Sequence, residues 1–180
     1  QLSRRYIQTE RMDDFRNRGH HALKAYIAAR EKMLEKAAKS EVDFRKEGVL
    51  LGEAHLAGKI DRLEIDTENK TISIVDFKTG KPHDKWERSV KLLKYKQQLY
   101  FYKFLIEGSH TWAGYTVKEA RLEFVEPNAA GKILDPLTVT FTNDEERAMK
   151  DLIAAVWRKV HSLDLVSSSY DASLKGTMAF

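Results

Sequence analysis

The sequence predicts an α/β fold in which helices pack on a central mixed β-sheet. Stretches with helical periodicity alternate with short stretches rich in β-branched residues, in the order helix, strands, helix, strands, helix. With 180 residues, the chain is long enough for one domain with a substantial core, and it has no internal repeat and no domain linker. We therefore expect residues 1–180 to form a single domain.

A long helix is predicted first, over residues 10–39. Apolar residues recur there in steps of three and four and form one stripe that we expect to face the sheet. The stripe contains Met12, Phe15, Gly19, Ala22, Tyr26, Ala29 and Met33. Strands are predicted next in residues 41–45, 48–66 and 71–77, and the polar stretch "TENK" before the last of them suits a hairpin turn.

A second helix is predicted over residues 86–107, and it is apolar on two sides, as is typical of a largely buried helix. Two further strands are predicted on either side of the turn "NAAGK", over residues 120–127 and 135–142. Thr142 and Glu145 have the spacing of a capping box at the start of a last amphipathic helix near residues 143–161. We expect the remaining tail to be loosely structured and the chain to be part of a longer one.

The composition excludes several classes of protein. No apolar run approaches the roughly 20 residues that a membrane-spanning helix needs. The chain has no cysteine, which excludes disulfides, cysteine-based zinc sites and iron–sulfur clusters. The absence of cysteine fits the reducing cytoplasm, where we expect the protein to act.

Positive charge is concentrated between residues 78 and 103, where eight lysines and arginines face only two acidic residues. Such a segment can neutralise phosphates. Lys91 and Lys94 lie beside Tyr95, and lysines interleaved with aromatic rings suit a strand of nucleic acid. The alternative is an ordinary solvated helix face, which the charge pattern alone favours slightly.

Charged residues also lie in strands that otherwise have the composition of a core. Asp76 and Lys78 alternate with Val75 and Phe77, so the carboxylate and the ammonium project from the same face of the strand. A turn near "TENK" would bring Asp61 opposite Asp76. Neighbouring carboxylates repel each other unless a cation lies between them, and oxygen ligands suit Mg²⁺ or Mn²⁺. The alternative is a plain cross-strand salt bridge.

Four short motifs occur along the first two thirds of the chain. They are "HHALKAYI" at 20–27, "GKIDR" at 58–62, "IVDFKTG" at 74–80 and "QLYFY" at 98–102. Together they resemble the RecB-type branch of the PD-(D/E)XK nucleases. The resemblance implies a restriction-endonuclease-like fold and metal-dependent hydrolysis of DNA. It also implies a helicase domain or subunit as partner in DNA repair or recombination, and DNA that is single-stranded or unwound by that helicase.

The resemblance also assigns roles to individual residues. It implies that Asp61, Asp76 and Lys78 are catalytic, and that Asp61 and Asp76 bind Mg²⁺ or Mn²⁺ together with the main-chain carbonyl of Phe77 and the imidazole of His20. It implies that Gln98 and Tyr102 contact the DNA backbone. Their i, i+4 spacing places both on one helix face, close to Lys91, Lys94 and Tyr95, which we also expect to bind DNA.

The choice of His20 over His21 rests on helix geometry. Each residue of an α-helix turns by about 100°. Measured from Gly19, His20 lies at the edge of the apolar stripe and His21 lies nearly opposite, so only His20 is expected near a metal held by strands.

Two functional hypotheses follow. The first is a metal-dependent nuclease, and the second is a catalytically inactive module on the same fold that holds DNA or docks a helicase. The joint presence of Asp61, Asp76 and Lys78 favours the first, because a degenerate domain usually loses one of these residues. A purely structural domain leaves the co-occurrence of the motifs unexplained.

Overall fold

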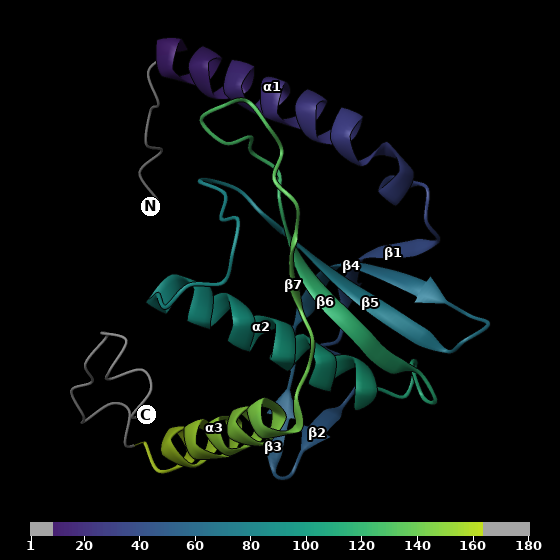
Figure 1. Cartoon of the computed structure of the whole chain (residues 1–180). Coiled ribbons are helices and arrows are strands. Elements are labelled where there is room, and N and C mark those ends of the chain that lie inside the picture. The colour runs from purple at the N-terminus through teal and green to yellow at the C-terminus, as the bar shows by residue number, and fades with distance from the viewer. Residues whose placement is uncertain (1–8, 164–180) are drawn as a thin grey trace.

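The computed structural model describes residues 9–163 and confirms the predicted α/β architecture (Figure 1). The central sheet consists of β1 (Ala38–Asp43), β4 (Lys59–Asp66), β5 (Thr71–Lys78), β6 (Thr116–Phe124) and β7 (Leu137–Val139). Its strand order is β1-β4-β5-β6-β7. The sheet is mixed, because β5 and β6 are parallel whereas the other neighbouring strands are antiparallel. A separate hairpin is formed by β2 (Val49–Leu51) and β3 (Ala54–Leu56).

The described residues form three helices, of which two cover the sheet (Figure 1): α1 (Thr9–Leu34), α2 (Val90–Glu107) and α3 (Asn143–His161). α1 crosses one face, and α2 covers the other and forms the crossover that the parallel pair β5 and β6 requires. α3 packs against α2 and the β2–β3 hairpin. No helix within residues 9–163 has the length and apolar character needed to cross a membrane.

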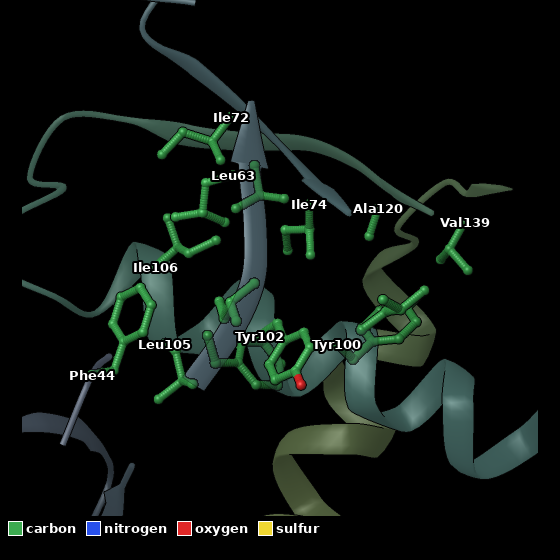
Figure 2. Close-up of a cluster of buried hydrophobic side chains, with 14 of the residues drawn as sticks. Phe44, Leu63, Ile72, Ile74, Tyr100, Tyr102, Leu105, Ile106, Ala120 and Val139 are labelled. Atoms are coloured by element: carbon green, nitrogen blue, oxygen red, sulfur yellow. The ribbon is translucent and has the colours of Figure 1, made fainter. Parts of the chain in front are cut away.

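The main core lies between the sheet and α2. Figure 2 shows Leu63 and Ile74 of the sheet directed toward Leu105 and Ile106 of α2, and all four side chains are fully buried. α2 also contacts α3, which explains why its sequence is apolar on two sides. The sheet face that carries Asp76 and Lys78 is therefore the face covered by α2.

The predicted apolar stripe of α1 is only half correct. Ala22, Tyr26 and Met33 are buried, but Met12 and Phe15 are 44% and 57% exposed. The periodicity identified the face of the helix correctly but not the length over which it is covered, because residues 11–21 are exposed throughout. Only the C-terminal half of α1 packs on the sheet.

Capping residues set the helix boundaries. α2 begins at Val90 rather than at 86, because the Ser89 side chain caps it by accepting a hydrogen bond from the Leu92 amide. The predicted cap of α3 is confirmed, since the Thr142 side chain accepts from the Glu145 amide at 3.3 Å. The tail predicted to be loosely structured, from residue 164 on, lies outside the described residues.

A buried network of charges lies between α1 and the sheet. Arg121 of β6 pairs with Glu64 of β4 at 2.6 Å and with Glu123 at 3.1 Å, and all three residues are buried. Arg30 of α1 pairs with the same Glu123 at 3.2 Å, and Arg62 donates to the carbonyl of Met33 at the end of α1. These contacts place each buried charge beside an opposite one, and they hold α1 together with an apolar cluster that contains Tyr26, Met33 and Ile133.

Arg121→Ala should destabilise the protein by about 3–5 kcal/mol, because it leaves two buried carboxylates without their main counter-charge. Urea unfolding measures the loss. Arg16→Ala is the matched control, since Arg16 pairs with Asp13 on the exposed side of α1 and such pairs contribute about 0–1 kcal/mol. An Arg121→Ala protein that unfolds together with the control would contradict this role for the network.

Candidate active site

Asp61 and Asp76 meet at the end of the β4–β5 ladder. The antiparallel register pairs Arg62 with Val75, so Asp61 and Asp76 are the next two residues along it. The Asp61 side chain accepts a hydrogen bond from the Phe77 amide at 2.9 Å, which fixes one of its oxygens against β5. The two carboxylates therefore project from neighbouring strands toward the same face.

Lys78 is held on the same face as Asp76, as strand alternation predicts. Its ammonium nitrogen lies 2.6 Å from Oδ2 of Asp76 and donates to Oε1 of Gln98 at 2.8 Å. It also lies over the Tyr95 ring, 4.4 Å from the centroid. Because the Lys78 side chain is only 14% exposed, these contacts define its position.

Gln98 and Tyr102 form the second half of this arrangement. The amide nitrogen of Gln98 donates to the Tyr102 hydroxyl at 2.6 Å, while the amide oxygen of Gln98 accepts a hydrogen bond from the Lys78 ammonium. Tyr102 is buried in the core, and burial together with the Asp76 charge raises the pKa of Tyr102 to about 12. Tyr102 therefore remains protonated at neutral pH.

The environment of Asp76 opposes its ionisation. Burial raises the pKa of the Asp76 carboxyl above its usual range and outweighs the opposing effect of Lys78, and the charge of Asp61 raises the pKa further. The Lys78 ammonium pairs with Oδ2 of Asp76, and within the described part of the chain no hydrogen bond of ordinary geometry satisfies this buried oxygen. A buried carboxylate oxygen that lacks a hydrogen bond can accept an additional cation as its partner.

The remaining predicted residues lie further out. Lys91 and Lys94 are exposed on the first turns of α2, with Lys91 5.7 Å from the Tyr95 ring centroid. His20 and His21 are both exposed on α1. Among residues 9–163, no group of three or more His, Cys, Asp or Glu side chains is placed to hold a metal ion. The structure thus brings Asp61, Asp76 and Lys78 together but does not add His20, whose role as a ligand stays a prediction.

The sequence did not identify one residue that lies close to this site. Glu126, just beyond β6, accepts a hydrogen bond from the Gly80 amide two residues after Lys78. Its distance along the chain from Gly80 hides the contact, and a single carboxylate in a loop carries no motif. Arg62, next to Asp61 in β4, is buried beneath α1 and donates to the Met33 carbonyl there.

A mixed sheet flanked by helices, with two strand carboxylates and a lysine on one face, defines a class of nucleic-acid hydrolases. The sequence matches the family model of the PD-(D/E)XK nuclease superfamily over residues 2–172. The chain therefore belongs to that superfamily, and its sheet and helices form a restriction-endonuclease-like fold. No individual curated protein matches the sequence.

Nucleases of this superfamily generally use divalent metal ions. The donors at this site fit such an ion, because two carboxylates from adjacent strands supply oxygen ligands. One of their buried oxygens also has no hydrogen-bond partner among residues 9–163. Lys78 is the only counter-charge that the described contacts give Asp76 directly. Two carboxylates beside one ammonium leave an excess of negative charge that a divalent cation would offset.

Without divalent metal, Asp76→Asn should be more stable than the wild type at pH 7. The raised pKa of Asp76 means that folding favours its protonated form, which Asn mimics. The stability that the wild type gains from a protonated Asp76 carboxyl is fully present below the unfolded-state pKa of about 4. It is lost as pH rises through the higher pKa of the native state. The difference in unfolding free energy should therefore be largest at neutral pH and shrink toward pH 4. Urea unfolding of both proteins in chelator measures it, and a wild type that is the more stable protein at pH 7 would contradict the assignment.

Proposed function

We propose that this protein is a metal-dependent deoxyribonuclease of the RecB type. The observation that carries the proposal is the joint placement of Asp61, Asp76 and Lys78 on one sheet face. A cross-strand salt bridge alone requires one carboxylate, whereas this site has two carboxylates for one ammonium. The superfamily match supports nuclease activity, and the RecB-type motifs support DNA as the substrate.

Asp61 and Asp76 would hold Mg²⁺ or Mn²⁺, with the Phe77 carbonyl and His20 as the further ligands expected. A bound divalent ion would polarise the phosphodiester and activate water. Lys78 provides a fixed positive charge beside the carboxylates, where it can stabilise negative charge that develops on the phosphate. Gln98 and Tyr95 keep its ammonium at that place, so little reorganisation is needed when the substrate arrives.

The DNA would lie along the first turns of α2. Lys91 and Lys94 are exposed there beside the half-buried ring of Tyr95, which suits contacts to phosphates and bases. Gln98 and Tyr102 were expected to contact the DNA as well. Within the protein, Gln98 accepts a hydrogen bond from Lys78 and donates one to Tyr102, so these two residues also support the position of the Lys78 ammonium. DNA contacts by Gln98 and Tyr102 stay a prediction, beside those of the lysines and Tyr95.

The proposal extends to the cellular setting. A RecB-type nuclease would act on single-stranded or helicase-unwound DNA in the cytoplasm, joined to or bound by a helicase during repair or recombination. The second candidate is an inactive module that holds DNA or docks a helicase. One observation favours it, namely that exposed His20 does not join Asp61 and Asp76 in a group of three ligands.

Incubation of labelled single- and double-stranded DNA with the protein in Mg²⁺, Mn²⁺ or chelator separates the two candidates. We expect metal-dependent cleavage that falls by about 100-fold or more in Asp76→Asn, the scale on which loss of one preorganised charged group acts. Asp84→Asn is the control, because Asp84 is exposed in the segment between β5 and α2. Cleavage by folded Asp76→Asn protein at the wild-type rate would refute the catalytic assignment. DNA binding without cleavage in any metal would favour the inactive module.

A further inference from the structure

The backbone that follows Lys78 is attached to the end of β6 at two points. The Val125 amide donates to the Lys78 carbonyl at 3.0 Å, which extends the parallel pairing of Lys78 with Phe124 by one residue. The Gly80 amide then donates to Oε1 of Glu126 at 2.7 Å. The first contact is an ordinary strand hydrogen bond, whereas the second depends on a side chain.

Gly80 turns the chain away from the sheet. Its φ of +98° lies in the left-handed region, and no heavy atom lies within 4 Å of the position that a Cβ would occupy. The backbone conformation, rather than lack of space, therefore requires glycine here. A glycine is also the residue with the greatest conformational freedom, so an external contact is needed to hold this turn in one conformation.

Glu126 also reaches α1. Its Oε2 accepts a hydrogen bond from the Arg18 guanidinium at 2.5 Å, while Oε1 remains with Gly80. The Arg18 hydrogen bond and then the Gly80 amide lower the pKa of Glu126, so Glu126 is a carboxylate at neutral pH. The Arg18 side chain is 63% exposed, and an ion pair at such a site contributes little. The bond from the Gly80 amide is also charge-assisted, and it requires no long exposed side chain to be ordered.

We propose that Glu126 is a positioning residue for Lys78 and acts through its hydrogen bond with the Gly80 amide. The proposal rests on the nuclease function proposed above. Lys78 must place its ammonium within 3 Å of both Asp76 and Gln98, and the direction of its side chain follows from the backbone on either side. β5 and the Val125 amide fix that backbone as far as the Lys78 carbonyl, and Glu126 fixes it two residues further on, at Gly80.

The test compares three variants of Glu126 and its surroundings. Glu126→Ala removes both contacts, Glu126→Gln keeps an acceptor for the Gly80 amide but loses the charge, and Arg18→Gln removes only the ion pair. Asp135→Ala is the matched control, because Asp135 lies in the same connection between β6 and β7 and approaches Arg30 of α1 at 3.9 Å. Each protein is assayed for kcat and KM with DNA, and for hydrogen exchange at the Gly80 amide by NMR in chelator.

We expect Glu126→Ala to lower kcat by roughly 10-fold, within the ~100-fold that a displacement of 1 Å can cause, with KM little changed. Exchange at the Gly80 amide should accelerate by at least about 10-fold, since a hydrogen bond to a charged group contributes roughly 1.5–3 kcal/mol. Glu126→Gln should restore most of both values, and Arg18→Gln and Asp135→Ala should resemble the wild type.

Two results would overturn the proposal. One is a wild-type kcat in Glu126→Ala. The other is a loss in Arg18→Gln equal to that in Glu126→Ala, since the contact with α1 would then be the one that matters. If Glu126→Ala fails to fold, Glu126→Gln decides, because an accelerated exchange at the Gly80 amide with a wild-type kcat in that variant would overturn the proposal. Lys78→Ala distinguishes a failure of the proposed nuclease function from a failure of the positioning role. Unchanged cleavage in that variant refutes the catalytic role of Lys78. It then also refutes the positioning role of Glu126, whatever the exchange rate of the Gly80 amide.

Discussion

The register of β4 against β5 places Asp61 beside Asp76, and the rest of the site depends on that pairing. A shift by one residue would turn Asp76 and Lys78 to the face covered by α1 and bring Phe77 into the space below α2. The alternating apolar residues prevent such a shift, because Leu63 and Ile74 are fully buried against α2. The core thus determines which face carries the charges, and it also buries Asp76 deeply enough to raise the pKa of that residue.

α2 contributes both to the core and to the site. Its apolar residues pack on the sheet and on α3. On the side toward β5, Tyr95 and Gln98 contact the Lys78 ammonium, and Tyr102 accepts a hydrogen bond from Gln98. A rigid helix therefore holds the charge that the proposed reaction needs. α1 on the other face is held through paired buried charges such as Arg30 and Glu123, and its N-terminal half is exposed. The two faces of the sheet are thus stabilised by different interactions.

The sequence predicted the parts of this arrangement that follow from local pattern. Strand alternation placed Asp76 and Lys78 on one face, and the capping box at Thr142 placed the start of α3. It could not show how much of α1 is covered, because periodicity identifies a helix face but not the extent of the surface beneath it. This is why Met12 and Phe15 were expected to be buried and are exposed.

The sequence also could not predict contacts between residues that are far apart in the chain. Gln98 had the spacing of a DNA-contacting motif, and only the folded chain shows its oxygen against Lys78. Glu126 lies in a loop and meets Gly80 only because β5 and β6 are parallel neighbours. The paired charges beneath α1 involve two strands, β4 and β6, and a helix, so no single segment reveals them.

The central claim is that Asp61 and Asp76 form a site for a divalent cation. A thermal unfolding titration of the wild type, Asp61→Asn and Asp76→Asn with Mn²⁺ tests it most directly and does not depend on cleavage. A cation that binds only the native state stabilises it by about 2.7 kcal/mol at 100 times its Kd. The account predicts that Mn²⁺ raises the melting temperature of the wild type and leaves both variants near their values in chelator. A wild-type melting temperature that is the same in Mn²⁺ and in chelator would contradict it.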